Sequence, residues 1–341
     1  MTADTSALDR PDAERPTLKT IAFMTGLGVT TVSRALKDAP EIGEATKTRV
    51  RLVAAQVGYR PNRAGVRLRT GKTNVVSLIL NTEEQVGGFV SDIIYGISEV
   101  LAKTPFHLIV TPYSGSNDPL APVRYVLETG SADGVIISRT EPDDRRVRFM
   151  TERGFPFATH GRTDMGIAHP FHDFDNAAFA RLAVHRLAGL GRKRLALIGP
   201  SPSLSYAAHT REGFLEGLAE TGLAEVPFPG ITVDHPMDAI RTAATRLAGR
   251  KAAPDGVVSA AGAATLALVA GLEDAGWVLG READVVSKQA IPILKLFRPA
   301  LHVVEEDVRG AGRALAHAVL GAIEGRPPAS LQSLSAPAET F

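Results

Sequence analysis

The clearest structural pattern in the sequence lies at Thr17–Thr73, TLKTIAFMTGLGVTTVSRALKDAPEIGEATKTRVRLVAAQVGYRPNRAGVRLRTGKT. Thr17 can cap a helix, and the apolar spacing after it predicts a short helix from Leu18 to about Thr25. Gly26-Leu27-Gly28 should end that helix, because its glycines permit a tight turn. The pattern then predicts two further helices, Val29 to about Lys37 and about Glu44 to Val57. Three short helices with a tight first turn are typical of a helix-turn-helix unit, although a small helical bundle of another purpose has the same outline.

The charge of this segment sets it apart from the rest of the chain. Between Arg15 and Lys72 there are 12 Lys and Arg residues against 3 Asp and Glu residues, a net charge of +9. The whole chain of 341 residues has a net charge of +1, so the remainder has −8. A small basic segment joined to a larger acidic body is typical of a protein that brings one end to nucleic-acid phosphates. The small polar face of the second helix favours the same interpretation over a plain bundle.

Three motifs inside the stretch have a fixed order and spacing: Val32-Ser33-Arg34-Ala35-Leu36, Gly58-Tyr59-Arg60-Pro61-Asn62 and Leu68-Arg69-Thr70-Gly71. Together they resemble the headpiece and hinge of the LacI/GalR family of transcriptional regulators, and three motifs in register are a specific signal. The resemblance implies base contacts in the major groove from Val29, Thr30 and Arg34. It implies phosphate-contacting or docking positions at Thr31, Ser33, Tyr59, Asn62 and Arg63. Leu68 matches the leucine that two subunits of such proteins wedge into the central minor groove.

From Val75 the pattern changes to apolar strands that alternate with helices. Buried strands are predicted at Val75–Leu80, Phe106–Val110, Gly134–Ile137, Phe155–Thr159, Arg194–Ile198, Gly256–Ser259 and Asp284–Val286. Near-continuous apolar strands separated by helices predict parallel sheets that are covered on both faces. Two consecutive series of this kind predict two Rossmann-like subdomains with a ligand cleft at the strand carboxyl ends.

Landmark sequences extend the resemblance into this region: Asp173–Asn176 (DFDN), Gly191–Gly199 (GRKRLALIG) and Glu305–Gly325 (EEDVRGAGRALAHAVLGAIEG). They imply an α/β periplasmic-binding-protein-like core. The expected organisation is a disordered tail over 1–16, a helix-turn-helix headpiece over 17–62, a hinge helix or linker over 63–73 and an effector-binding core over 74–341. The resemblance implies that the chain crosses between subdomains near 174, 302 and 332. The N-subdomain then takes about 74–174 and 303–332, and the C-subdomain about 175–302 and 333–341.

The effector site is expected between the subdomains. By position, the candidate contacts are Phe89, Arg162, Asp175, His209 and Gln289, although Phe89 in the core, Arg162 paired with a carboxylate and His209 at the surface are competing interpretations. Gln289, Thr210 and Ala263-Ala264 stand where the family commonly has Asp, Arg and Asn-Asp. The neutral amide of Gln289, together with Phe89 and Arg162, favours a sugar or sugar derivative as effector. A purine, a nucleoside or a sugar phosphate stays open as the alternative.

Other classes of protein fit the residues less well. No phosphate-binding loop, dinucleotide fingerprint or nucleophile elbow occurs, so we do not expect an enzyme or a cofactor. His169, His172, Asp173 and Asp175 lack the spacing of metal ligands, so no metal is expected. The chain has no cysteine and no apolar run of membrane-spanning length, and its first residues lack the order of a secretory signal. These features favour a cytoplasmic, nucleoid-associated protein over a free solute-binding protein, and the large core argues against a factor that only bends DNA.

The mechanism implied by the resemblance is that of a homodimer on a pseudo-palindromic operator in double-stranded DNA. An effector would change the orientation of the subdomains and, through the hinge, the affinity for the operator. Repression relieved by an inducer is the default expectation, and corepression and activation stay open. The Pro- and Ser-rich end of the chain after Gly325 predicts no coiled coil, so a dimer is expected in preference to a tetramer.

Overall fold

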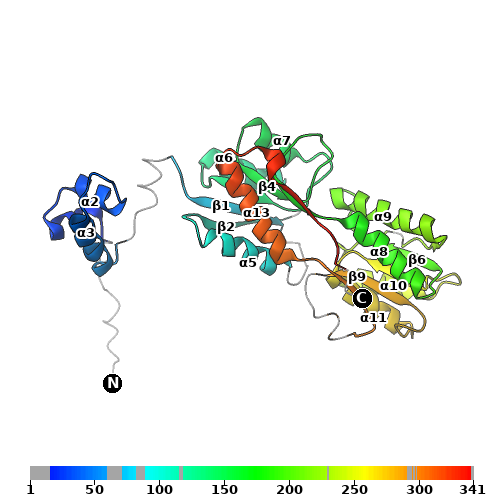
Figure 1. The fold of residues 1–341 in the computed structure, drawn as a ribbon. Coiled ribbons are helices and arrows are strands. Elements are labelled where there is room, and N and C mark those ends of the chain that lie inside the picture. The colour runs from blue at the N-terminus through cyan, green and yellow to red at the C-terminus, as the bar shows by residue number, and fades with distance from the viewer. Residues whose placement is uncertain are drawn as a thin grey trace, which may run out of the picture. The chain divides into compact units, whose positions relative to one another are not determined.

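The computed structural model describes residues 16–59, 71–81, 89–114, 118–228, 230–289, 294, 296 and 298–338. The chain forms two compact units, Met1–Thr73 and Asn74–Phe341, each described below by itself (Figure 1). Of the predicted contacts, Asn62, Arg63 and Leu68 lie outside the described residues, and so does the side chain of Gln289.

The first unit contains the three helices that the sequence predicts. They are α1 (Leu18–Thr25), α2 (Val29–Leu36) and α3 (Glu44–Gln56). Thr17 caps α1 by accepting a hydrogen bond from the backbone N–H of Thr20, and Gly26 ends the helix at φ 67°. That left-handed conformation is costly for residues with a Cβ atom, so glycine is suited to the turn between α1 and α2. A shared core holds the three helices together, with its fully buried members at Ile21, Val32, Ala35 and Val50.

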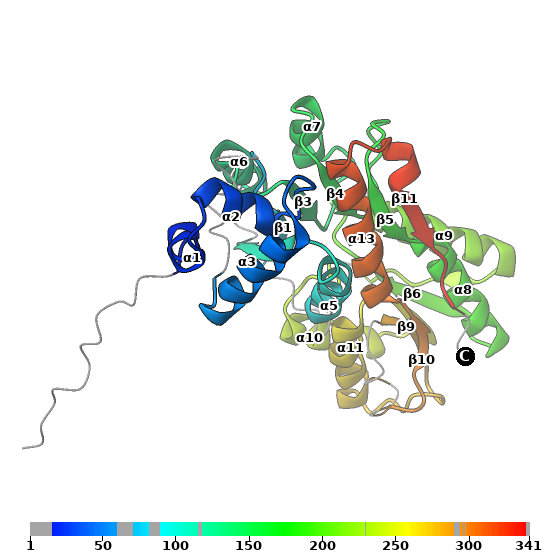
Figure 2. The ribbon, with the colours of Figure 1, turned by 60° about the vertical axis from the view of Figure 1, so that its left-hand side comes forward.

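The second unit contains two parallel sheets, as the alternating pattern predicts. The sheet of the N-lobe has the order β11-β5-β4-β3-β1-β2. Its strands are β1 (Val75–Asn81), β2 (His107–Tyr113), β3 (Gly134–Ile137), β4 (Phe157–His160), β5 (Phe171–Phe174) and β11 (Gln332–Ser335). Helices α5 (Phe89–Leu101) and α13 (Val308–Ile323) pack side by side over one face (Figures 1 and 2). Helices α6 (Leu120–Thr129) and α7 (Arg145–Glu152) cover the other.

The sheet of the C-lobe has the order β10-β9-β8-β6-β7. Its strands are β6 (Arg194–Ile198), β7 (Ala224–Glu225), β8 (Gly256–Ser259), β9 (Asp284–Gln289) and β10 (His302–Glu305). Alternate strand residues face opposite layers: Val257 and Val285 pack toward α10 (Met237–Ala248) and α11 (Gly262–Asp274), as Trp277 also does. Val258 and Val286 pack toward α8 (Asn176–Gly189) and α9 (Ser205–Thr221). A short 3₁₀ helix, η1 (Pro328–Leu331), precedes β11.

Two expectations need correction. The strand predicted as buried at Phe106–Val110 is the edge strand β2, and Ile109 and Val110 are 45% and 40% exposed, because β2 pairs with β1 on one side only. The second and third crossings between the lobes come later than 302 and 332. His302–Glu305 still pairs with β9, and Gln332–Ser335 still pairs with β5, so the chain leaves each sheet only after Glu305 and after Ser335.

Candidate functional site

The first candidate surface is the solvent-facing side of α2. Val32 and Ala35 point into the headpiece core, which leaves Val29, Thr30 and Arg34 exposed at the other side. Thr31 and Ser33 are half-buried at the borders of this surface. The 3.6-residue period of the helix therefore places the three predicted base-contacting side chains on one face.

Two separate sets of ion pairs lie around α2. Arg34 Nη1 lies 3.3 Å from Glu41 Oε1, and both side chains are largely exposed. Asp38 Oδ1 lies 3.0 Å from Lys47 Nζ and 2.8 Å from Arg51 Nη2. The hydrogen bonds from Lys47 and Arg51 lower the pKa of Asp38. The negative charge at Asp38 thus orients cations of α3.

Tyr59 lies at the end of the described headpiece. It packs against the cluster of the three helices, and its burial raises the pKa of the phenol. Its N–H donates to the carbonyl of Ala54 at 2.9 Å. These contacts fix the point at which the chain leaves the headpiece.

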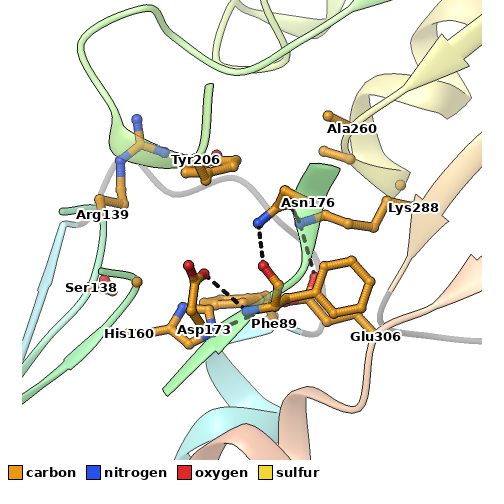
Figure 3. A pocket seen from close by; sticks show the side chains of 14 residues that line it. Phe89, Ser138, Arg139, His160, Asp173, Asn176, Tyr206, Ala260, Lys288 and Glu306 are labelled. Atoms are coloured by element: carbon orange, nitrogen blue, oxygen red, sulfur yellow. Dashed lines mark hydrogen bonds and ion pairs between the residues drawn. The ribbon is translucent and has the colours of Figure 1, made fainter. Parts of the chain in front are cut away.

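The second candidate site is a cavity of about 780 Å³, including its open mouth, between the two lobes of the second unit. It lies at the carboxyl ends of the parallel strands, where open α/β sheets bind ligands. Residues of both lobes line it (Figure 3): Phe89, Ser138, Arg139, His160, Gly161, Asp173, Phe174, Asn176, Tyr206, Ala260, Ala261, Gly262, Lys288 and Glu306.

Lys288 and Glu306 form the buried centre of this lining. Lys288 Nζ lies 3.1 Å from Glu306 Oε2 and donates to Asn176 Oδ1 at 2.9 Å. Asn176 Nδ2 donates in turn to the carbonyl of Phe174 at 2.9 Å, which fixes the amide orientation. Burial opposes ionisation of Glu306, but the charges of Lys288 and His160 outweigh it, and the pKa of Glu306 is lowered. Glu306 is therefore a carboxylate, and its contact with Lys288 is held in place by a third polar side chain, that of Asn176.

His160 and Asp173 face the cavity from the ends of β4 and β5. Burial lowers the pKa of His160 to about 4, although Glu306 opposes the shift, and its ring centroid lies 5.4 Å from that of Phe89. Burial raises the pKa of Asp173, although Arg162 opposes the shift. Within the described residues, His160 Nε2 has no hydrogen-bond partner, whereas Asp173 Oδ2 is in ion-pair contact with Arg162. The site thus offers one buried polar atom, His160 Nε2, to a ligand.

Arg139 joins the two lobes at the edge of the cavity. It follows β3 in the N-lobe and has φ 53°, an uncommon conformation for a residue other than glycine. Its Nη1 donates to Asp234 Oδ1 in the C-lobe at 2.8 Å. The backbone N–H of Ser205 in the C-lobe donates to the carbonyl of Thr140 at 2.9 Å, beside this pair in the sequence. Both contacts would respond to a change in the angle between the lobes.

The predicted effector contacts have different positions in the structure. Phe89 lines the cavity, whereas Arg162 lies behind the lining, with its Nε 3.1 Å from Asp173 Oδ2. Asp175 does not line the cavity, because its carboxylate accepts from Ala178 N–H and caps α8. His209 is half-buried on α9 and does not line the cavity. Its electrostatic interaction with Asp173 opposes the rise in the pKa of that carboxyl. Thr210 is fully buried and donates to the carbonyl of Tyr206.

Four residues that line the cavity are absent from the effector contacts predicted from the sequence: Asp173, Asn176, Lys288 and Glu306. A signal was present for three of them. Asp173 and Asn176 belong to the quoted stretch DFDN, and Glu306 to EEDVRG. Each lies just at or after the end of a strand, which is where a doubly wound sheet places its ligand.

The histidines considered as metal ligands have other partners. His169 Nε2 lies 3.1 Å from Thr159 Oγ1, and His172 Nδ1 lies 2.9 Å from Ser333 Oγ. The part of the chain that the structure describes contains no group of three or more potential metal ligands. In that same part no helix combines the length and the apolar character needed to cross a bilayer.

Comparison with known proteins links both sites to described families. Residues 17–62 match the bacterial regulatory proteins of the lacI family, and residues 184–340 match the periplasmic binding protein-like domain. The chain is 32% identical to the HTH-type transcriptional regulator AglR of Rhizobium meliloti, over 90% of this chain and 87% of that protein. It is also 32% identical to the HTH-type transcriptional regulator RafR of Escherichia coli, over 92% and 94% of the two chains.

Solved structures show the same fold. The lac repressor dimer bound to operator and the anti-inducer ONPF superposes with a TM-score of 0.81 at 19% identity, over 95% of this chain and 97% of that chain. The complex of the transcriptional regulator CelR with cellobiose superposes with a TM-score of 0.66 at 23% identity, over 95% and 98%. At these identities the likeness concerns the fold.

Proposed function

The chain belongs to the LacI family of bacterial regulatory proteins, and we propose that it is a repressor whose operator affinity is controlled by a sugar bound between its lobes. It is a DNA-binding transcriptional regulator like the other members, which are not enzymes. Its place of action is then the nucleoid. The unit that reads DNA is the headpiece over 17–62 with the hinge over 63–73, and the sensing unit is the core over 74–341.

The exposed face of α2 supports the DNA-reading role. Arg34 can donate two hydrogen bonds to a guanine, and Val29 can contact a thymine methyl group. Thr30 completes the base-reading set. Around it, Thr31, Ser33, Tyr59, Asn62 and Arg63 would contact or dock on phosphates, and Leu68 would enter the minor groove. Two headpieces of a homodimer would read the two halves of a pseudo-palindromic operator.

The sugar assignment rests on one observation: aromatic rings and polar groups line the same cavity between the lobes. Phe89 and Tyr206 supply apolar faces, and His160, Asp173 and Asn176 supply hydrogen-bonding groups. A sugar has apolar C–H faces and hydroxyls that both donate and accept, so this lining matches it. The cellobiose complex of the relative CelR supports the same class of ligand.

The lobes supply the coupling. A sugar that contacts residues of both lobes favours one angle between them, and contacts such as Arg139–Asp234 differ between the two angles. The hinge is joined directly to the N-lobe. A change in the orientation of the lobes in a dimer would therefore change the spacing of the two hinges and of the headpieces attached to them. The affinity for the operator then changes by the coupling free energy.

A thermal-shift screen of the full chain tests the proposal. The panel contains mono- and disaccharides, polyols, sugar phosphates, purines and nucleosides. A ligand at one hundred times its Kd adds roughly 2.7 kcal/mol to the free energy of unfolding. We expect a sugar to stabilise the wild type and the Phe89→Ala variant to lose that shift, while Asp238→Asn on the exposed start of α10 retains it. Stabilisation by a purine without any response to sugars would contradict the sugar assignment.

A further inference from the structure

The charged groups that line the cavity between the lobes are all paired with groups of opposite sign. Arg139 pairs with Asp234 at 2.8 Å, Asp173 with Arg162 at 3.1 Å, and Lys288 with Glu306 at 3.1 Å. Two of the cations and two of the anions line the cavity, and Arg162 and Asp234 pair with them from outside the lining. Over the described residues that line the cavity, the site therefore has charged side chains but no net charge.

Two of the three N–H donors of Lys288 already have partners, and aromatic rings lie around the ammonium group. An ammonium group has three N–H donors. One direction of Lys288 Nζ is taken by Glu306 and a second by Asn176, as given above. The remaining surroundings are two rings, with Nζ at 5.1 Å from the centroid of Phe174 and 5.4 Å from that of Tyr206. Such ring faces stabilise the cation and exclude a phosphate from that side.

Arg139 also has an anionic partner, because its Nη1 donates to Asp234 Oδ1. Asp234, its partner, is itself fixed because its second oxygen accepts from the backbone N–H of Ser201 at 2.8 Å. The side chains of Arg139 and Asp234 are only 23% and 26% exposed, so the pair is partly shielded from water. A ligand phosphate could engage Arg139 only by competing with a carboxylate that the C-lobe already holds in place.

His160 and Asp173 add no positive charge to the cavity. The low pKa of His160 leaves its imidazole neutral at pH 7. Asp173 is paired with Arg162 through Oδ2, and its Oδ1 accepts from the backbone N–H of Phe174. A carboxylate oxygen can accept a further hydrogen bond from a hydroxyl, whereas it would repel a phosphate oxygen.

We propose that the cavity selects uncharged polyhydroxylated sugars and discriminates against phosphorylated and carboxylated ones. The inference rests on the proposed function and narrows the effector class of the same site. Its physical basis is that an anion would need to displace one carboxylate from its cation and leave that carboxylate unpaired in a shielded site, which is strongly unfavourable. A neutral sugar can use the paired groups as donors and acceptors without breaking any pair.

Calorimetric titration of the full chain with matched ligands tests this inference. The probes are cellobiose, maltose, lactose and melibiose, each beside its 6-phosphate, at one ionic strength. For the neutral sugar that binds, we expect the 6-phosphate to bind at least tenfold more weakly. A 6-phosphate that binds as tightly as its neutral parent, or more tightly, would overturn the inference and leave the sugar assignment intact. Binding of neither form of any sugar, with binding of a purine, would overturn the proposed effector class itself.

A pair of variants tests the role of charge pairing directly. Asp234→Asn releases Arg139 while keeping the shape of the side chain, so the ratio of phosphate affinity to neutral-sugar affinity should rise at least fivefold and fall again at high salt. Asp238→Asn removes the same charge from the same lobe, outside the cavity, and should leave the ratio unchanged. Equal ratios in the two variants, or an unchanged ratio in Asp234→Asn, would contradict the inference.

Discussion

At the scale of single residues, Arg34 forms a weak ion pair with Glu41 that a contact with DNA could replace. Its pair with Glu41 is exposed on both sides, and such pairs contribute only about 0–1 kcal/mol in solution. The guanidinium is therefore oriented at the surface of α2 but is easily released. A bidentate contact with a guanine could replace the pair at little cost, as the proposed base contact of Arg34 requires.

We predict that Arg34→Ala weakens binding to a selected operator duplex by about 1–3 kcal/mol but changes binding to a scrambled duplex little. Fluorescence anisotropy at one salt concentration measures both affinities. The matched control is Glu41→Gln, which frees Arg34 and should not weaken operator binding. An equal loss on both duplexes would remove Arg34 from the base-reading set.

His160 gives a prediction on pH. Its pKa in the folded chain is about 4, below the ordinary value of 6.5, because burial disfavours the imidazolium; Glu306 opposes this shift, and His172 and Lys288 add to it. Between these two pH values the unfolded chain binds more protons, so the contribution of His160 to stability is present above pH 6.5 and is lost as the pH falls toward 4. The loss amounts to roughly 2–3 kcal/mol.

Urea unfolding at several pH values between 4.5 and 7 measures this dependence. The His160→Asn variant should show a shallower fall in unfolding free energy toward acid than the wild type. The control is His317→Asn, which removes an imidazole from the exposed side of α13 and should retain the wild-type dependence. Identical slopes in wild type and His160→Asn would show that His160 is not the group responsible.

Single-residue chemistry was only partly predictable from the sequence. The pattern of α2 identified its exposed face because three residues of one helix suffice for that inference. Asn176, Lys288 and Glu306 meet in one network although long segments separate them in the chain. No local pattern relates their spacing, so only the folded lobes bring them together.

At the scale of elements, close helix contacts shape the C-lobe. Gly213 on α9 faces the backbone of α8, and a Cβ atom there would lie 2.0 Å from the carbonyl oxygen of Ala177. The contact lies beside Asn176, so the packing of α8 on α9 also sets the position of the network around Lys288. Glycine is needed here for its size.

We predict that Gly213→Ala lowers the free energy of unfolding by about 1–3 kcal/mol or more, because two helices must move apart. The control is Gly189→Ala in α8, where an added Cβ meets nothing within 4 Å and φ is not positive. That variant should be neutral or slightly stabilising. Urea midpoints at constant slope measure both changes. Equal stability of the two variants would contradict the close contact.

Elements themselves were largely predictable, and the misses have a physical reason. The apolar run around Phe106–Val110 resembles that of β1, but β1 is central and β2 is an edge strand. Both strands share the preference for extended backbone, and their different burial follows from the order of strands in the sheet.

At the scale of the whole molecule, the core consists of two sheets joined by three crossings. The pairing of His302–Glu305 with β9 and of Gln332–Ser335 with β5 puts the second and third crossings after Glu305 and after Ser335. Strand pairing decides these points, and a pairing partner is not visible in the local sequence. Glu306 lies directly after the second crossing point. Its contact with Lys288 is therefore next to a segment that connects the two lobes.

Reciprocal titration shows whether a sugar in the cavity between the lobes controls binding to DNA. Operator affinity is measured with and without the saturating neutral sugar, and sugar affinity with and without operator. Both affinities should change by the same factor, about 5- to 150-fold, and Phe89→Ala should abolish the change caused by the sugar. A sugar that binds free and operator-bound protein equally, with operator affinity unchanged, would show that the cavity does not control binding to DNA.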